Sequence, residues 1–527
     1  MYDIFVKNGR IIDGTGNPWF YGDIGIVEDK IAFIGKSQGD VEAKEIIDVS
    51  GKYVTPGFID LHTHSDFTIL PNPLGESKIR QGITTEVGGN CGFSLGPVEC
   101  KYLDQLKKFV AFMPVELSWD WKDIGGFLDK IKAQGTSVNF GTLVGQGVLR
   151  IAAMGFENRV AQKHELEKMK EDLQTALDQG ALGLSVGLVY APGSYAPIDE
   201  LLELVKIVAK NDKIFTAHVR NEGEKVEESI GEVLSIAEAT GVNLHISHLK
   251  ATGQDNWPKM DRIIEMIEKT RAKGIDVTFD VYAYNALNTL LTALLPGWGQ
   301  EGGVEAIVRR IEDKSSKRAL MEELEKENLK YGGWQNIMVA SVKYDQNKWA
   351  EGKTIMQIAE EQGKVPAEAM LDLLHDDECS IMVVCFSMDD ENVIKALKHP
   401  LSMLGSDGKS LSTEGKLAAG RPHPRNYGAF PRFIAKYVRD KGIMPLEEAI
   451  RKMTSAPAQK IKKRRRGILR EGFYADVVIF DYEKIEDKAT FIKPQQYPEG
   501  IDCIIVNGKI TISNGQHTGA LAGQIIT

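Results

Sequence analysis

The chain is poor in cysteine and has no long hydrophobic run. Its five cysteines are spread over 527 residues, an odd and sparse set that excludes the disulfide framework of small secreted domains. The N-terminal stretch MYDIFVKNGRIIDG alternates apolar with polar and acidic residues, so it predicts neither a signal peptide nor a membrane helix. We therefore expect a cytoplasmic protein that does not enter the membrane, in which any special cysteine is a metal ligand or a nucleophile.

Positive charge is also in deficit. Lysine and arginine together number 64, against 74 aspartates and glutamates, which gives a net charge of -10 at pH 7. A nucleic-acid-binding protein needs a basic field to displace counterions from phosphates. The acidic balance therefore argues against nucleic acid as a partner and favours a small-molecule substrate. It indicates nothing about the oligomeric state.

The two ends of the chain share the same sequence pattern of short β-rich runs. A chain of this length exceeds the roughly 250 to 300 residues at which a single core stops growing, so more than one structural unit is expected. Residues 1–56 consist of short β-rich runs separated by Gly and Asn-Gly turns. Similar runs return within residues 467–527, in GFYADVVIFD and IDCIIVNGKI. The pattern predicts one small β-sandwich assembled from both chain ends.

Residues 57–466 have a different rhythm, in which apolar strand candidates alternate with helices such as HELEKMKEDLQTALDQG. The candidates are TTEVGG, VNFGTLVG, ALGLSVG, KIFTAHV, NLHISHL, DVTFDVYAY, SIMVVCFS and LSMLGSD, besides the short run GFID. Repeated strand-helix units predict the α/β class, and about eight of them favour a closed (β/α)8 TIM barrel over an open sheet. Catalytic residues of such barrels gather where the strands end.

The alternation of strand and helix patterns is interrupted between about residues 286 and 350. There LNTLLTALLPGWGQEGG is followed by the charged helix KSSKRALMEELEKENLK. We interpret this segment as an insertion over the barrel mouth. It is either a substrate lid or a solvated helical excursion, and for a long insertion the two are equally probable.

Two histidines one residue apart follow a short apolar run in PGFIDLHTHSD. Side chains of an extended chain alternate faces, so His62 and His64 point to the same side and can reach one ion. Taken alone, the pair is equally well two polar residues at the end of a buried strand, because this spacing is frequent by chance.

Three later strand ends supply more side chains of the kinds that bind metals. His218 ends the apolar run in KIFTAHVRNEG, and His248 does so in NLHISHLKATG. His245 has the opposite parity to His248, which favours a packing or supporting role, whereas Lys250 shares the face of His248 if the strand continues. Asp407 closes the strand in LSMLGSDG, where a carboxylate can bind metal or accept a proton.

Cys91 lies in the loop GGNCGFS, directly after the strand candidate TTEVGG. The flanking glycines would let the backbone pass close to a metal centre. A small buried hydrophobic residue is the evenly weighted alternative, since that is the usual environment of a free cysteine. Thiolate and imidazole together suit Zn²⁺, whereas Mg²⁺ and Ca²⁺ prefer oxygen ligands. If these side chains meet, the expected metal is zinc.

Two further segments match the sequence motifs of known sites but lack the neighbouring helix or strand that those sites require. GLSVG at residues 183–187 fits the nucleophile elbow around Ser185, but it runs into the Pro- and Gly-rich loop LVYAPGSYAP instead of a helix. GWGQEG fits a dinucleotide-binding loop, but Pro296 precedes it and no strand does. We expect neither a serine hydrolase nor a dinucleotide site.

The assembled motifs resemble the amidohydrolase superfamily. They are PGFIDLHTHSD, GGNCGFS, GLSVGLVYAPGSYA, AHVRNEG, SHLK, GSDG and PHPRNYG, followed by ADVVIFD. Within the superfamily the chain is most similar to the N-acyl-D-amino-acid deacylase (D-aminoacylase) family. The resemblance spans almost the whole chain, and the ordered series is far more specific than any one of its motifs.

The resemblance implies a zinc hydrolase. In it Cys91, His218 and His248 would hold one tightly bound Zn²⁺, and a second, weaker position would be lined by His62, His64 and Asp407. Asp407 would act as general base and then as general acid. The number of ions present during turnover stays open.

The resemblance also implies a partner for the substrate's free carboxylate. This is Arg425 in PHPRNYG, whose planar guanidinium suits bidentate carboxylate binding. Lys250 and Tyr284 would lie nearby, and Tyr190 would contact the substrate. The residues alone predict only that Arg425 lies in a loop.

The function expected from these features is hydrolysis of N-acyl-D-amino acids to a carboxylic acid and a free D-amino acid. A D-aminoacyl dipeptidase is a close variant. A cyclic amidase of the hydantoinase or dihydroorotase type is the second enzyme hypothesis, although no counterpart of its carboxylated lysine is found on an early strand. A catalytically silent barrel is the third, and it would be expected to lose ligands that are all present here.

Overall fold

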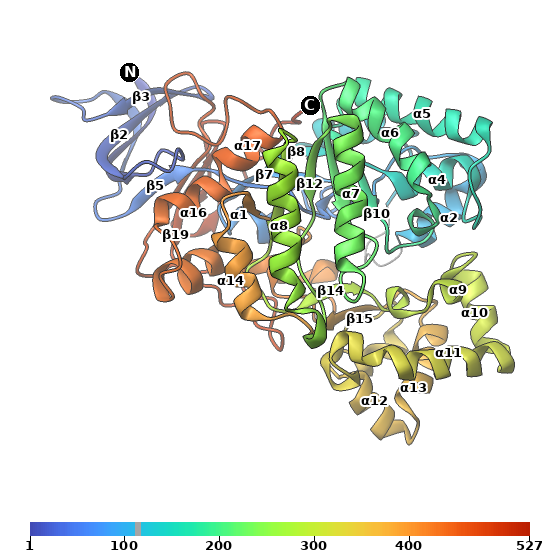
Figure 1. Ribbon diagram of the computed structural model, residues 1–527. Coiled ribbons are helices and arrows are strands. Elements are labelled where there is room, and N and C mark those ends of the chain that lie inside the picture. Colours follow the sequence, from blue (N-terminus) through green and yellow to red (C-terminus); the bar gives the residue numbers. More distant parts are fainter. Residues whose placement is uncertain (111–116) are drawn as a thin grey trace.

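The computed structural model describes residues 1–110 and 117–527, apart from the side chains of residues 329 and 330. A β domain, a barrel and a helical insertion follow one another across the molecule (Figure 1). Within the described ranges, no helix is long and apolar enough to cross a membrane.

The β domain is built from both chain ends, as predicted. Its strands are β1 (Tyr2–Ile11), β2 (Phe20–Val27), β3 (Lys30–Gly35), β4 (Ala43–Asp48), β5 (Tyr53–Pro56), β18 (Val477–Phe480), β19 (Ile501–Val506), β20 (Lys509–Ser513) and β21 (Gln516–His517). They form one hydrogen-bonded sheet in the order β21-β20-β19-β18-β5-β1-β2-β3, with β4 paired to β1. The antiparallel pair β5 and β18 joins the two ends of the chain. Apolar residues from both ends share one core, among them Ile4, Val6, Ile24, Val477 and Ile505.

The barrel is a (β/α)8 barrel, which confirms the predicted fold class. Its parallel strands are β6 (Phe58–Asp60), β7 (Ile83–Gly88), β8 (Asn139–Thr142) with β9 (Val144–Gly145), β10 (Gly183–Gly187), β11 (Ile214–His218), β12 (Asn243–Ile246), β13 (Val277–Val281) and β17 (Ser402–Leu404). One arc runs β6-β7-β8 and the other β9-β10-β11-β12-β13-β17. The arcs meet where Asp407 N donates to His62 O and His64 N donates to Gly408 O, each at 2.8 Å.

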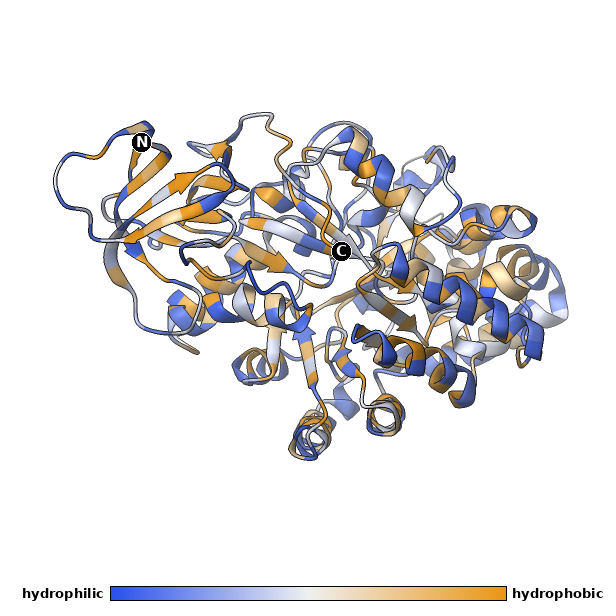
Figure 2. Ribbon diagram, turned by 90° about the horizontal axis from the view of Figure 1, so that it is seen from above, coloured by the Kyte–Doolittle hydropathy of each residue, from blue (hydrophilic) through white to orange (hydrophobic). Residues whose placement is uncertain are grey.

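Amphipathic helices cover the outside of the barrel (Figures 1 and 2). They include α3 (Ile124–Gln134), α4 (Gln146–Met154), α5 (Lys163–Asp178), α6 (Ile198–Lys210), α7 (Val226–Thr240), α8 (Lys259–Ala272), α14 (Asp390–Lys398), α16 (Leu446–Met453) and α17 (Ser455–Lys460). Helix α6 buries Leu201, Leu204, Val205 and Val208, the three- and four-residue spacing that places one face on the sheet.

The insertion between β13 and β17 is longer than the sequence predicts. It contains an antiparallel sheet of β14 (Leu287–Leu290), β16 (Met382–Cys385) and β15 (Ile337–Ser341). Its helices are α9 (Gly297–Gln300), α10 (Val304–Glu312), α11 (Lys314–Glu327), α12 (Ile355–Gln362) and α13 (Pro366–Asp376). The run SIMVVCFS is therefore wrong as a barrel strand, because it forms β16. A short apolar run looks alike in a barrel and in any other buried sheet.

The C-terminal residues lie beside the barrel. Phe140 N donates to Gln524 O and Ile526 N donates to Phe140 O, each at 2.9 Å. Ile526 is buried in a cluster with Leu143, Leu182 and Ile214. The end of the chain thus contributes a side chain to the packing of the barrel strands.

Candidate metal centre

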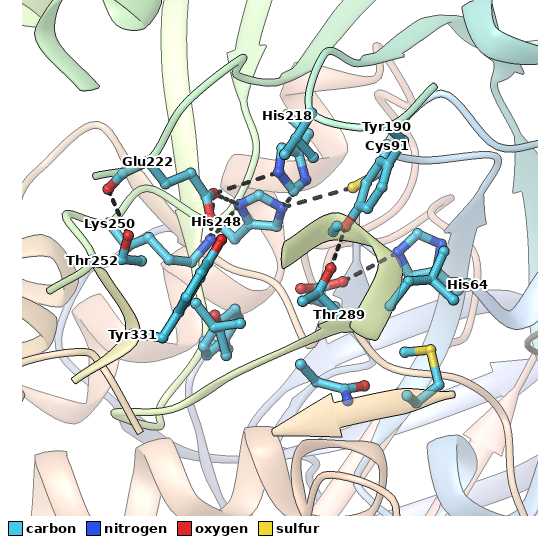
Figure 3. Close-up of a pocket in the computed structure, with 18 of the residues that line it drawn as sticks. His64, Cys91, Tyr190, His218, Glu222, His248, Lys250, Thr252, Thr289 and Tyr331 are labelled. Carbon is cyan, nitrogen blue, oxygen red and sulfur yellow. Dashed lines mark hydrogen bonds and ion pairs between the residues drawn. The ribbon is translucent and has the colours of Figure 1, made fainter. Parts of the chain in front are cut away.

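Six side chains of metal-binding type meet where the barrel strands end (Figure 3 labels four of them). They follow or end β6, β7, β11, β12 and β17, and they are His62, His64, Cys91, His218, His248 and Asp407. Three groups of donor atoms each lie within 4.8 Å of one another: Cys91 with His218 and His248, His62 with His64 and Cys91, and His62 with His248 and Asp407. The residues that the sequence singles out for metal binding therefore converge.

The closest donors surround Cys91 and His248. Cys91 Sγ lies 3.2 Å from His62 Nε2 and 3.7 Å from His248 Nε2. His248 Nε2 in turn lies 2.9 Å from His218 Nδ1. All four side chains are more than nine-tenths buried, so their polar atoms face one another and not bulk water.

The backbone at three of these positions is left-handed. The φ angles of Cys91, His248 and Asp407 are 54°, 37° and 50°, a region that non-glycine residues rarely adopt. Such strain persists only where the surrounding structure holds it, and it clusters at functional sites. Since these residues lie beyond the regular strands, strand periodicity does not set the direction of their side chains.

The GLSVG motif holds the Cys91 loop in place. Ser185 Oγ donates to Gly89 O at 2.5 Å and accepts from Gly92 N at 3.0 Å. A Cβ added at Gly187 would lie only 1.9 Å from Cys91 O, so only glycine allows this approach. The contacts of Ser185 and Gly187 with the Cys91 loop thus explain the motif by packing, without nucleophilic catalysis.

Asp280, near the end of β13, contacts the rings of two histidines and the backbone that follows β12. Its carboxylate lies 3.0 Å from His62 Nδ1 and 3.0 Å from His245 Nε2, and it accepts from His248 N at 2.9 Å. Burial alone would raise the pKa of Asp280, but His62 and His245 hold that pKa well below its usual range. His245 supports the centre through Asp280, and the parity argument does not decide this role because His248 lies beyond the end of β12.

Glu222 contacts the rings of His248 and His218. Its Oε1 is 3.0 Å from His248 Nδ1 and 3.8 Å from His218 Nε2. Lys250 Nζ lies 2.6 Å from the same oxygen. Burial would raise the pKa of Glu222, but Lys250 and the two histidines lower it below its usual value. The carboxylate therefore stays ionised and leaves His248 Nε2 turned toward Cys91.

The electrostatics favour ionised Cys91 and Asp407. Burial opposes ionisation of the Cys91 thiol, but His62, His218 and His248 hold its pKa well below the usual range. Burial also opposes ionisation of Asp407, whose pKa is held well below its usual value by Arg425 and His62. A thiolate among imidazoles is a donor set that fits a zinc-type ion better than Mg²⁺ or Ca²⁺.

These donors open into a cavity that also contains most of the residues predicted to bind substrate. Tyr190, Lys250 and Arg425 line it, together with Leu287, Asn288, Leu290 and Met382 of the insertion. The insertion therefore forms one wall of the site.

Arg425 is the first residue of helix α15 (Arg425–Arg432) and not a loop residue. Its Nη1 lies 2.9 Å from Asp407 Oδ2.

Tyr284 is placed differently from the prediction. It is fully buried outside the residues that line the cavity, and its Oη donates to Asp487 Oδ2 at 2.7 Å. Tyr282 lines the cavity instead, with the Arg425 guanidinium 4.8 Å from its ring centre. The chain turns directly after β13, so the two tyrosines do not keep the common face of a strand.

Sequence reasoning missed four residues around the site, namely Glu222, Asp280, Tyr282 and Lys409. Glu222 and Asp280 had a usable signal, because each is an acidic residue at or just after a strand end, as Asp407 is. Lys409 follows Asp407 by two residues and lines the cavity. No pattern distinguishes it from a surface lysine.

The chain belongs to the amidohydrolase family, whose match covers residues 45–512. Among curated proteins it is similar to two enzymes of Alcaligenes xylosoxydans xylosoxydans. One is a D-aminoacylase, 31% identical over 100% of this chain and 97% of the relative. The other is an N-acyl-D-glutamate deacylase, 32% identical over 96% and 93%.

Solved structures give the same result. A D-aminoacylase structure superposes with a TM-score of 0.84 at 31% identity, covering 100% of both chains. The N-acyl-D-glutamate deacylase of Bordetella bronchiseptica, complexed with zinc and a phosphonate mimic of the tetrahedral intermediate, has a TM-score of 0.82 at 31% identity and covers 100% of this chain and 99% of that one. Hydantoinase structures at 18% identity and below share the fold. These comparisons support metal binding in this family, and the cluster of donors described above is the candidate metal centre of this chain.

Proposed function

We propose that the protein is a zinc-dependent deacylase that hydrolyses N-acyl-D-amino acids to a carboxylic acid and a free D-amino acid. The observation that carries this proposal is the position of Asp407. One of its oxygens lies 3.2 Å from His64 Nε2, and the other lies 2.9 Å from Arg425 Nη1. A carboxylate suited to proton transfer thus lies between the metal centre and a cation suited to the carboxylate of an amino acid.

Cys91, His218 and His248 would hold a tightly bound Zn²⁺, and His62, His64 and Asp407 would line a weaker second position. The close packing of the first three donors and the low pKa of the Cys91 thiol support this division. When bound, zinc supplies Lewis acidity, which polarises the scissile carbonyl and lowers the pKa of a water molecule.

Asp407 would move the proton. Because its pKa is depressed, its carboxylate is ionised and accepts a proton from the attacking water at one oxygen. The same carboxyl group then donates the proton to the leaving nitrogen, without which the amine is a poor leaving group. His64 and Arg425 orient the carboxylate from its two sides.

Arg425 would bind the substrate's free carboxylate. Its Nε is buried and has no hydrogen-bond partner within residues 1–110 and 117–527, so the guanidinium retains a donor for a ligand. Tyr282 supports its planar face and takes the place predicted for Tyr284. Lys250 and Tyr190 would contact the substrate from other walls of the cavity, Lys250 while held by Glu222.

A hydrolysis screen tests the proposal. The purified protein is incubated with N-acetyl-D-amino acids, their L-enantiomers, D-dipeptides and cyclic amides, with and without added Zn²⁺. We expect turnover of the N-acetyl-D-amino acids and little of the L-series. Preferential opening of cyclic amides would contradict the assignment, as would undiminished activity in protein shown by elemental analysis to be metal-free. The cytoplasmic location expected from the sequence stays a prediction.

A further inference from the structure

A second cavity of about 320 Å³ lies beside the metal centre, between the barrel and the insertion. Tyr190 and Leu290 line both cavities. Tyr190 Oη lies 3.0 Å from Thr289 Oγ1, and Figure 3 shows this pair beside Cys91 and His218. The second cavity is therefore adjacent to the site of proposed chemistry.

A series of aromatic contacts connects the two cavities. The ring of Phe93 lies 6.1 Å from that of His64, 5.1 Å from Tyr190 and 4.6 Å from Phe109. Phe109 in turn lies 5.8 Å from Phe156. Phe109 ends helix α2 (Leu103–Phe109). Both Phe109 and Phe156 line the second cavity. An apolar wall thus extends from a histidine of the metal centre into this cavity.

The lining of the second cavity suits an alkyl chain. Leu290, Val304 and Ile307 add apolar surface to that of the two phenylalanines. The charged lining residues Lys108, Glu305 and Arg309 are exposed, and Lys108 pairs with Glu305. Small-molecule sites are usually concave and mainly apolar, with few polar groups.

The proposed chemistry decides which part of the substrate points toward the second cavity, so the inference rests on the proposed function. Asp407 and Arg425 would hold the leaving nitrogen and the carboxylate, which places the amino-acid half on their side. The acyl chain begins at the carbonyl carbon itself, on the opposite side of the scissile bond. Phe93 and Tyr190, which line the cavity of the metal centre, would face that side. The amino-acid side chain begins two bonds further away, on the Arg425 side.

We propose that the second cavity is an acyl-chain subsite, and that the preferred substrates carry an extended apolar acyl group such as octanoyl rather than acetyl. Tyr190 and Leu290 form the passage between the scissile carbonyl and this subsite. Each methylene that is fully transferred from water into such a cavity should raise kcat/KM by roughly fourfold. Incomplete burial reduces this gain.

Two matched substrate series locate the subsite. The first compares N-acetyl-D-alanine with N-octanoyl-D-alanine, and the second places the same extension on the side chain, in N-acetyl-D-2-aminooctanoate. We expect kcat/KM for the octanoyl substrate to exceed that for the acetyl substrate by at least about tenfold, with a smaller gain in the side-chain series. Equal rates for acetyl and octanoyl, or a larger gain in the side-chain series, would overturn the proposal.

Cavity-filling variants test the residues. Ile307→Trp, or the milder Val304→Phe, should lower kcat/KM for the octanoyl substrate at least tenfold more than for the acetyl substrate. Val308→Trp is the matched control, because Val308 lies on the same helix and does not line the cavity. Equal losses in the control would overturn the assignment.

Binding of octanoate separates this inference from the proposed function. Calorimetry on the zinc-loaded protein should detect octanoate binding that Ile307→Trp weakens and Val308→Trp does not. If no N-acyl-D-amino acid is hydrolysed but octanoate binds in this way, the proposed function fails and the apolar subsite stands. If octanoate does not bind, the subsite is refuted whatever the activity.

Discussion

His62 and Asp280 form a buried pair in which Nδ1 of the ring faces the carboxylate at 3.0 Å. Because this nitrogen is engaged, Nε2 is the one that faces Cys91 at 3.2 Å and Asp407 at 3.5 Å. Carboxylates behind metal-binding histidines fix the tautomer and the orientation of the ring. The two residues are 218 positions apart in the chain, so the pair exists only because the barrel closes.

The first prediction concerns that pair. Asp280→Asn should weaken metal binding by roughly 10- to 100-fold, since the amide keeps only one acceptor oxygen and turns an NH₂ donor toward groups that now donate to the second oxygen. Competition with a chelator measures the affinity independently of activity. Asp276→Asn, at an exposed position just before the same strand, serves as the control. Unchanged affinity in Asp280→Asn would remove the carboxylate from this role.

The second prediction separates metal binding from proton transfer. Asp407→Asn should lower kcat by about a hundredfold or more, because an amide cannot accept the proton of the attacking water. Zinc content measured by elemental analysis should stay near one ion per chain, because Cys91, His218 and His248 are intact. Normal turnover in this variant would exclude Asp407 as the general base.

The third prediction concerns the substrate's carboxylate. Arg425→Lys should raise KM for N-acetyl-D-amino acids by about tenfold or more, because a single ammonium group cannot replace bidentate binding. The same variant should affect the corresponding amino-acid amides much less. An equal change for acid and amide would show that Arg425 acts through Asp407 and not on the carboxylate.

The fourth prediction is a pH dependence of stability. Burial lowers the pKa of Lys460 from 10.5 to about 7; nearby Asp276 opposes this change, while Arg271 and Lys462 add to it. The unfolded chain therefore binds the proton more tightly, and the free energy of unfolding should rise between pH 7 and 10.5. Lys460→Met should remove a rise of roughly 2 to 4 kcal/mol.

Chemical denaturation at several pH values measures the effect of Lys460. Lys398→Met, at an exposed position, is the control and should leave the slope of stability against pH unchanged. A slope that survives Lys460→Met would assign the rise to other groups.

The fifth prediction concerns the C-terminal residues beside the barrel. Ile526→Ala should lower the free energy of unfolding by about 2 kcal/mol, because Ile526 is 6% exposed and packs with barrel residues. Ile492→Ala, at a position that is 72% exposed, should change stability by less than about 0.5 kcal/mol. Denaturant titrations compare the two, and equal effects would contradict the packing role.

Errors in the sequence predictions have identifiable physical causes. The run SIMVVCFS is apolar on both faces, and periodicity alone cannot assign such a run to the barrel or to the insertion sheet. Tyr284 was predicted beside the substrate, but the chain turns after β13 and presents Tyr282 there. Glu222 and Asp280 were not predicted. Their position at or after a strand end marks them as candidates, but a carboxylate that supports a histidine has no spacing rule that would assign its partner along the chain.

By itself, the sequence determined the α/β alternation, the β domain shared by both chain ends and the kinds of donor that follow the strands. These features are local, because hydrophobic period and residue type act over a few positions. The tertiary structure decided which nitrogen of each histidine faces the centre, which carboxylates hold the rings, and which tyrosine reaches the cavity. Those outcomes depend on residues brought together by barrel closure and on left-handed turns beyond the strand ends, where periodicity no longer applies.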